Sequence, residues 1–204
     1  MSTIVTQPIY IVVSQTSTIL SRLLQKITGA QYNHVSISLE SDLDTMYSFG
    51  RRNPYNPFWG GFVQESPEHG TFKRFTETEV IVLELSVDPD TYSSMKAFLD
   101  AMYRNKKLYH YNYVGLVLAA FHICYAQHNR YYCSEFVRDI LLRFRVVPDR
   151  HFRSIPQPIH FLDLPSAEVV YRGKLKHFAS CSLLHSTRNR NTPPGEALRF
   201  YLFC

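Results

Sequence analysis

The chain has 204 residues, of which 45% are hydrophobic and 19% are charged. This composition excludes a disordered chain and suits a single folded domain with a sizeable core. The formal net charge of +5 comes without a long run of Lys or Arg, so we expect no nucleic-acid partner.

Strands dominate the elements predicted for the first fifty residues. Residues 9–14 predict a short strand, and an apolar face over residues 19–27 predicts a helix. Residues 33–39 alternate polar with apolar side chains, which is typical of a strand with one buried face. Residues 45–49 then predict the returning strand of a hairpin.

Residues 50–70 combine Gly and Pro turns with aromatic side chains. Tyr55 and Trp59 are too apolar for a plain solvated linker, so we expect this loop to pack over the core or over a ligand. Short strands are predicted at residues 61–65 and 71–75.

One further strand and two helices are predicted in the middle of the chain. The strand covers residues 79–87, where apolar side chains are dense. A helix capped by Asp90 follows it, with a buried stripe between residues 92 and 102. Residues 112–126 predict a very apolar helix.

The composition changes toward the C-terminus. Residues 148–165 contain four prolines and predict an extended segment, and residues 168–171 predict a strand. We expect one domain over residues 1–179. A divergent tail over residues 180–204, partly docked through its apolar end at residues 198–204, is expected to follow.

Cysteine usage and hydropathy suggest a cytoplasmic protein. The four cysteines include no CxxC pair and are too sparse for a disulfide scaffold, so reduced thiols are the simplest interpretation. No secretory signal is apparent. No stretch approaches the roughly 20 apolar residues of a spanning helix, so we expect no stable membrane insertion.

Residues 131–137 place a thiol where a helix begins. Cys133 opens an amphipathic run in which apolar side chains recur at helical spacing. The unpaired N–H groups and the dipole at a helix N-terminus favour a thiolate. Cys133 is therefore a candidate nucleophile, and the alternative is a small buried core residue.

A thiolate nucleophile needs a base or a cationic partner within hydrogen-bond reach. His34 is the best placed of the nine histidines, because it begins a half-buried strand on the same face as Ser36 and Ser38. The alternative is a strand-end histidine that points into solvent.

Four residues in one region carry metal-ligating atoms: His122, Cys124, His128 and Cys133. Their spacing matches no usual zinc pattern, and helix residues two apart do not face each other. We therefore expect no metal and no cofactor.

The two motifs, residues 33–39 and residues 132–137, together resemble the permuted NlpC-like cysteine hydrolases, in the YiiX/YebB-like branch of the papain-like superfamily. In that branch the His strand precedes the Cys helix, as it does here. The resemblance covers roughly residues 8–175, and residues 46–51 look like the second strand of that family.

This resemblance implies an α+β fold, with an antiparallel, β-barrel-like sheet packed against helices that include the nucleophile helix. It also implies that Cys133 attacks a carbonyl carbon, that His34 is its base, and that the Cys133 N–H helps to bind the oxyanion. Ser48 is then the expected orienter of His34, and Glu40 is its rival.

Four further residues are candidates for substrate binding. Tyr132 could line the cleft or donate to an oxyanion, or simply pack in the core. Glu135 could face the substrate or stabilise the helix start. Tyr55 and Trp59 could form an apolar wall for the substrate, although packing of their own loop is the default.

The expected function is an amidase, peptidase or esterase that forms a Cys133 acyl-enzyme. The expected substrate is a small peptide-like amide or an ester. A weak third position at Ser48 leaves open an inactive ligand-binding module on the same fold, and a lipid acyltransferase is a further alternative. The oligomeric state is left open.

Overall fold

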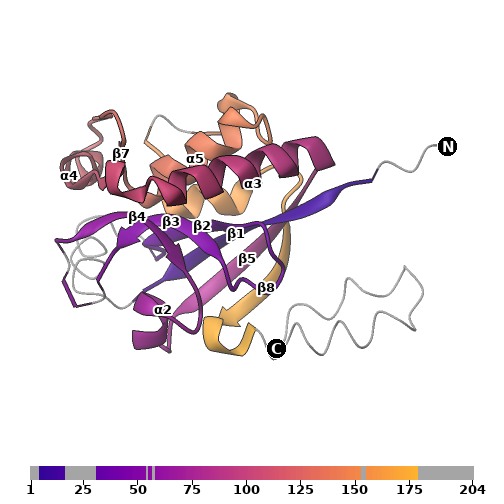
Figure 1. Ribbon diagram of the computed structural model, residues 1–204, viewed down its shortest axis with the longest axis horizontal. Helices are drawn as coiled ribbons and strands as arrows, with labels where there is room; N and C mark the ends of the chain where they lie inside the picture. The colour runs from indigo at the N-terminus through magenta and orange to yellow at the C-terminus, as the bar shows by residue number, and fades with distance from the viewer. Residues whose placement is uncertain (1–4, 17–30, 54, 57, 153–154, 179–204) are drawn as a thin grey trace.

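The computed structural model describes residues 5–16, 31–53, 55–56, 58–152 and 155–178, which form an α+β fold (Figure 1). Its centre is an eight-stranded sheet with the strand order β7-β6-β4-β3-β2-β1-β5-β8. Neighbouring strands are antiparallel, apart from the parallel pair of β6 and β7. The strands are β1 (Gln7–Gln15), β2 (His34–Ser38), β3 (Met46–Arg51), β4 (Gly60–Glu65), β5 (Glu79–Val87), β6 (His110–Tyr111), β7 (Arg130–Tyr131) and β8 (Glu168–Lys174).

Helices lie on both faces of this sheet. Figure 1 shows α3, α4 and α5 on one side and the short α2 on the other. No helix within these ranges is long and apolar enough to span a bilayer. The helices are α2 (Gly70–Arg74), α3 (Pro89–Arg104), α4 (Tyr113–Ala120) and α5 (Cys133–Arg143), with 3-10 turns η1 (Lys106–Leu108), η2 (Asp149–His151) and η3 (Pro158–Asp163).

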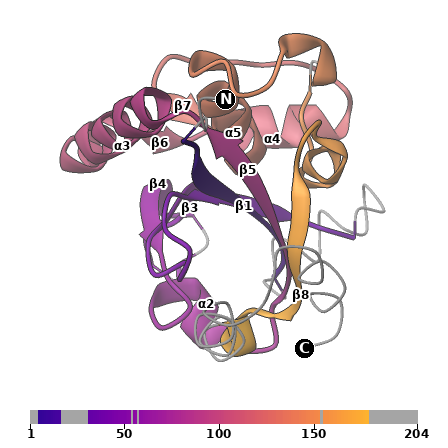
Figure 2. The same ribbon diagram turned by 90° about the vertical axis from the view of Figure 1, so that its right-hand side faces the viewer.

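The sheet is strongly curved but open. Figure 2 shows it bending from β3 and β4 across β1 and β5 to β8, with α2 beneath the curve. β7 and β8 are its two edges. The predicted packing of strands against helices is confirmed, whereas the barrel-like sheet is an open one.

β1 is an interior strand of the sheet that is buried on both faces. Ile9, Ile11 and Val13 enter the cluster beneath α3 and α5, whereas Tyr10 and Val12 enter the second cluster on the α2 side. Side chains alternate between faces along a strand, so one short apolar run supplies both cores.

Aromatic packing fixes α5 against the sheet. The ring centroid of Phe136, on the first turn, lies 5.3 Å from that of Phe49 on β3 and 5.3 Å from that of Phe62 on β4. All three side chains are almost fully buried. Such pairs add to the stabilisation from buried area, and they hold the start of α5 over β3 and β4.

The described strands confirm the predictions at residues 9–14, 33–39, 45–49, 61–65 and 79–87. The helix expected to begin at Cys133 and the strand expected at residues 168–171 are confirmed as well.

Three local predictions were wrong. The strand predicted at residues 71–75 is instead the short helix α2, which covers Gly70–Arg74, buries Phe72 and is capped by Phe75. α3 is capped by Asp88, whose carboxylate accepts from the Thr91 N–H at 2.8 Å, while Pro89 occupies the first helical position.

The apolar helix predicted at residues 112–126 is also shorter than expected. α4 ends at Ala120, and His122 then adopts a left-handed conformation with φ of 60°. The predicted helix at residues 19–27, the tail over residues 180–204 and its docked end lie outside the described residues.

The aromatic packing gives a direct test of what anchors α5. Replacing Phe136 by Ala should lower the free energy of unfolding by about 3–5 kcal/mol, because it removes a ring that is 1% exposed. Urea unfolding followed by circular dichroism measures this. Phe58→Ala is the matched control: its ring is 84% exposed, so a change within about 0.5 kcal/mol is expected. Equal losses in the two variants would contradict the assigned role of Phe136.

Candidate active site

Cys133 is the first residue of α5, as the sequence predicts. Tyr132 precedes it in an extended conformation, so the thiol lies where the helix begins. The cysteine is only 4% exposed and belongs to the cluster beneath α3 and α5. The positive end of the helix dipole and the first-turn N–H groups therefore act on the sulfur with little screening by water.

His34 begins β2 and interacts with the Cys133 thiol through a hydrogen bond. Gly50, on β3, makes room beside it. A Cβ atom at Gly50 would lie 3.7 Å from Cε1 of His34 and 3.0 Å from Oε1 of Glu65. A larger residue would therefore crowd the imidazole and its carboxylate partner, and glycine allows the two to meet.

Glu65, the last residue of β4, is the residue that sequence reasoning missed. Its Oε2 lies 2.8 Å from Nε2 of His34, and the Ser36 hydroxyl donates to the same oxygen at 2.8 Å. The Ser36 hydroxyl also lies 3.3 Å from Nε2. Because Glu65 engages Nε2, Nδ1 is the ring nitrogen left for the thiol. The three groups thus stand in the order Cys133, His34, Glu65.

The electrostatics of the site favour a charged pair. Burial alone lowers the pKa of His34, but the charge of the Glu65 carboxylate and the hydrogen bonds that the imidazolium donates to Cys133 and Glu65 outweigh it and raise that pKa to about 10. Burial alone raises the pKa of Cys133, but the hydrogen bond and charge of His34, with backbone groups of Val35 and Ser134, bring it below its ordinary value. Together these shifts favour thiolate and imidazolium near neutral pH.

Ser48 is not the orienter that the sequence suggested. It is fully buried, and its hydroxyl donates to the Val35 carbonyl at 2.8 Å, so it ties β3 to β2. The rival, Glu40, is exposed in the turn after β2, where its backbone carbonyl accepts from the Ser38 hydroxyl at 2.9 Å. The position beside His34 is taken by Glu65, from two strands away.

Glu135 and Tyr132 take part in the start of α5. Oε2 of Glu135 accepts the Tyr132 N–H at 3.4 Å, so the carboxylate supports the helix terminus. Burial raises the pKa of Glu135, while the Tyr132 amide and Asn112 act in the opposite direction. Tyr132 is 6% exposed; burial first, and then the charges of Glu135 and Cys133, raise the pKa of its phenol.

Tyr111 also interacts with Cys133, and no sequence pattern singled it out. Burial first, and then the charge of Cys133, raise the pKa of Tyr111. The ring of Tyr113 lies 4.6 Å from that of Tyr111, and the charges of both tyrosines act on Arg51. Nη2 of Arg51 is buried without a hydrogen-bond partner among the described residues. Tyr111 therefore lies near the thiol, and Arg51 interacts with Tyr111 and Tyr113.

The aromatic loop before β4 lies on the surface. Tyr55 is 77% exposed, and the guanidinium of Arg74 lies 4.2 Å above its ring. Trp59 is 55% exposed, and its carbonyl accepts the Arg52 N–H at 2.9 Å. Most of both rings faces solvent, so the expected apolar wall beside the nucleophile is not formed by these two residues in this conformation.

The four metal-ligating residues of the segment 122–133 differ in exposure, since Cys133 alone among them is buried. Cys124, His122 and His128 are exposed on the segment after α4. Within the described ranges no group of three or more His, Cys, Asp or Glu is arranged to hold a metal ion.

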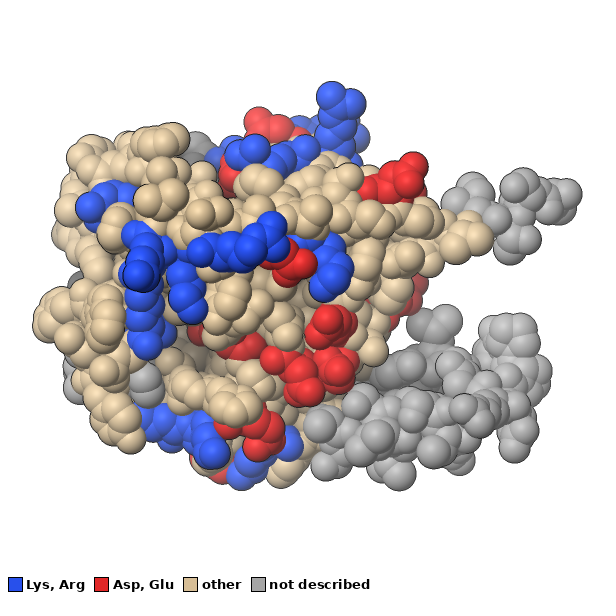
Figure 3. All heavy atoms as spheres, viewed as in Figure 1, with Lys and Arg blue, Asp and Glu red and all other residues tan. Residues whose placement is uncertain are grey.

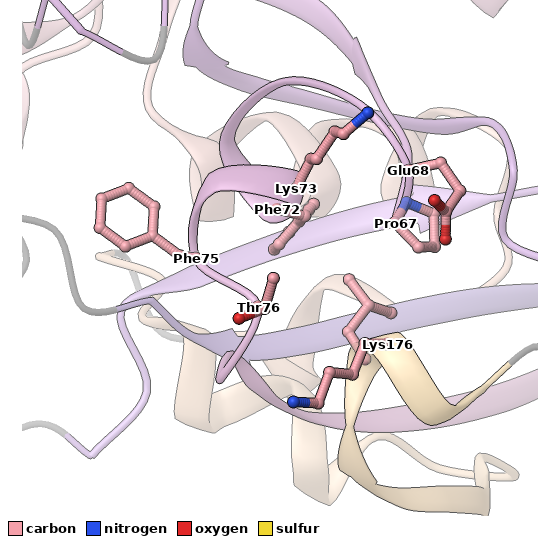
Figure 4. Close-up of a pocket in the computed structure, with 8 residues that line it drawn as sticks. Pro67, Glu68, Phe72, Lys73, Phe75, Thr76 and Lys176 are labelled. Carbon is pink, nitrogen blue, oxygen red and sulfur yellow. The ribbon is translucent and has the colours of Figure 1, made fainter.

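A pocket of about 280 Å³ lies on the α2 side of the sheet, away from the thiol (Figure 4). Phe72 is its link to the site, since its ring centroid lies 6.2 Å from that of His34. Cys133, His34 and Glu65 are not among the residues around the pocket, which are Pro67, Glu68, Phe72, Lys73, Phe75, Thr76, Leu175 and Lys176.

The lowered pKa of Cys133 predicts a distinctive pH profile of alkylation. Iodoacetamide should modify Cys133 at pH values well below the ordinary thiol pKa of 9.0, because the thiolate persists there. Replacing His34 by Ala should move the midpoint upward, since only the backbone groups of Val35 and Ser134 then oppose the effect of burial. Mass spectrometry of labelled peptides measures both profiles, with the exposed Cys124 as the internal control. Profiles that coincide in the two proteins would remove His34 from the pair.

The pH profile of Cys133 alkylation also distinguishes Glu65 from Ser48 as the partner of His34. Glu65→Gln removes the charge that raises the pKa of His34, so the imidazolium is weakened and the Cys133 profile should shift upward. Ser48→Ala leaves the Val35 carbonyl without its hydroxyl donor and should lower stability by about 1–3 kcal/mol. The pH midpoint of Cys133 alkylation should stay unchanged in Ser48→Ala. A shift in Ser48→Ala with none in Glu65→Gln would reverse the assignment.

Comparison with known proteins adds no assignment to this geometry. No family model matches the chain, and neither a curated protein nor a solved structure matches it. The roles considered below therefore depend on the contacts of the site residues and on the motifs that surround His34 and Cys133.

Proposed function

We propose that the protein is a cysteine hydrolase that cleaves an amide or ester through an acyl-enzyme on Cys133. The observation that carries the proposal is the position of His34. Its ring lies between the Cys133 thiol at a helix N-terminus and the Glu65 carboxylate, 2.8 Å from Nε2. A nucleophile, a base and an orienting acid in this order are what thiol-dependent acyl transfer requires.

The first half-reaction uses the thiolate and the imidazolium together. The Cys133 sulfur attacks the substrate carbonyl carbon, and the C=O electron pair moves to oxygen. The Cys133 N–H, in the first turn of α5 and without an intrahelical acceptor, is a donor for that oxyanion. His34 then gives its proton to the leaving amine or alcohol as the C–N or C–O bond breaks. The acyl group remains on sulfur.

The second half-reaction restores the enzyme. Neutral His34 accepts a proton from water, whose oxygen attacks the thioester carbonyl. Collapse of the tetrahedral intermediate breaks the C–S bond and releases the carboxylic acid. The leaving sulfur returns as a thiolate beside the imidazolium. Glu65 holds the ring in one orientation through both steps and balances the imidazolium charge.

Glu65 bears directly on the alternative of an inactive binding module. That alternative depends on Ser48, a weak orienting residue, being the partner of His34. A carboxylate at 2.8 Å is a stronger partner for an imidazolium than a hydroxyl, because its hydrogen bond is charge-assisted. The geometry therefore favours catalysis over ligand binding alone.

We also infer a permuted papain-like arrangement for the fold. Three features support it: the His strand precedes the Cys helix in the chain, α5 packs on a curved antiparallel sheet, and the orienting residue lies on a neighbouring part of that sheet. The low exposure of Cys133 and the surrounding tyrosines suit a small peptide-like amide or an ester with a slender acyl group.

Acyl-enzyme trapping tests the proposal. Incubation with p-nitrophenyl acetate should release nitrophenol and add one acetyl group to the peptide that contains Cys133, as read by mass spectrometry. Cys133→Ala should abolish both signals, and His34→Ala should slow acylation by about 10²–10⁴-fold. Cys124→Ala is the matched control, because that thiol is exposed and lies outside the site. Acetylation that is absent, or that persists unchanged in Cys133→Ala, would refute the mechanism.

A further inference from the structure

The exposed side of α4 is unusually apolar. Val114, Val117 and Phe121 recur at positions i, i+3 and i+7, so they form one stripe, and they are 56%, 54% and 65% exposed. A surface helix normally turns polar residues outward. Ile123 and Tyr125 continue the exposure after the helix, at 51% and 41%. These five residues are called the α4 surface below.

The aromatic loop borders this surface. A Cβ atom at Gly60 would lie 2.7 Å from the Tyr113 hydroxyl and 2.9 Å from Cβ of Tyr111, so the start of β4 abuts the start of α4. Trp59 precedes Gly60 and is 55% exposed, and Phe58 is 84% exposed. Two chain segments distant in sequence therefore expose large apolar side chains at one end of the molecule.

Positive charge is concentrated at the same end. Residues 45–64 and 101–134 supply β3, the loop, most of β4, the end of α3, η1, β6, α4, β7 and the start of α5. They contain six of the 22 Lys and Arg residues and none of the 17 Asp and Glu residues, although Asp44, Glu65, Asp100 and Glu135 directly flank them. The remainder of the chain carries one more acidic than basic residue, so this end accounts for the positive net charge. Figure 3 shows a band of blue Lys and Arg side chains beside a largely tan surface at that end.

We propose that this end of the protein adsorbs reversibly to an anionic phospholipid bilayer. The α4 surface and Trp59 would enter the boundary between headgroups and acyl chains, while the exposed Arg104, Lys106, Lys107 and Arg130 contact lipid phosphates. A bilayer of this kind complements both the apolar stripe and the charge. A second copy of the chain would match the apolar stripe but would place two basic rims against each other.

The candidate active site lies directly behind this surface. Asn112 caps α4 through the Gly115 N–H at 2.8 Å and also donates to the Tyr125 carbonyl at 2.9 Å. Tyr111, next to Asn112, is buried and interacts with Cys133; burial first, and then the charge of Cys133, raise its pKa. Adsorption would therefore hold the thiol at the bilayer surface. The adsorption itself does not depend on the proposed hydrolase function.

Vesicle co-sedimentation of the full chain tests the proposal. We expect binding to vesicles of phosphatidylcholine with roughly one third phosphatidylglycerol, weaker binding to phosphatidylcholine alone, and loss of the difference at high salt. The double variant Val117→Asp/Phe121→Asp should bind at least about tenfold more weakly. The double variant Lys106→Gln/Lys107→Gln should weaken binding on the order of tenfold at low salt.

Matched controls lie elsewhere on the molecule. Val169 is 41% exposed on β8, the opposite edge of the sheet from β7, so Val169→Asp should bind like the unmodified protein. Lys73→Gln/Lys176→Gln removes two lysines from the α2 side and should also leave binding nearly unchanged. Cys133→Ala should bind normally, which separates failure of adsorption from failure of the hydrolase proposal.

A second readout needs no substitution. Trp59 is the one tryptophan of the chain, so tryptophan emission reports this end alone. Its emission should shift to shorter wavelength on anionic vesicles. Absence of both sedimentation and the shift would overturn the proposal. Equal binding by Val117→Asp/Phe121→Asp would also overturn it, as would a concentration-dependent dimer that this variant dissociates while vesicles are not bound.

Discussion

The buried contact between His34 and Glu65 is the constraint on which the candidate site depends. Two groups of opposite charge are each about nine-tenths buried, and the carboxylate stabilises the charged form of the imidazole. Removing His34 would leave the Glu65 carboxylate as an uncompensated buried charge. Removing Glu65 would favour a neutral His34 ring. The contact spans from β2 to β4, and it is possible because β3, the strand between them, carries Gly50 at the crossing point. The Glu65 carboxylate thus connects the arrangement of β2, β3 and β4 to the Cys133 thiol through His34.

The second requirement is a fixed distance between the sheet and the start of α5. Phe136 meets Phe49 and Phe62 one turn after the thiol, and the backbone of Val35 acts on the sulfur from β2. The start of the helix is therefore held against β3 and β4, while the backbone of β2 acts on its first residue. A rigid first turn matters for the proposed mechanism, in which both the thiolate and the oxyanion depend on N–H groups with fixed directions.

Local sequence patterns predicted Cys133 and His34 as members of the candidate site, but they did not predict Glu65. The alternation around His34 and the helical spacing after Cys133 are short-range signals, so strand and helix were both predictable. Glu65 becomes a partner only through the register of three strands, which no short-range pattern encodes. Ser48 lies on the adjacent strand, which makes it a plausible partner of His34 from the sequence, but its hydroxyl donates to the Val35 carbonyl. Composition likewise predicted an apolar helix near residue 115 without predicting that its stripe would face outward.

In the proposed hydrolase mechanism, the small exposed fraction of Cys133 has a consequence for kinetics. A sulfur that is 4% exposed meets a substrate only when neighbouring side chains move, so the rate of entry would be set partly by their fluctuations. Tyr111 and Tyr132 are bulky neighbours that interact with the thiol. Selection among substrates then begins before any bond is made, through the time for which the entrance stays open. Such gating also shields the thiolate from oxidants between turnovers.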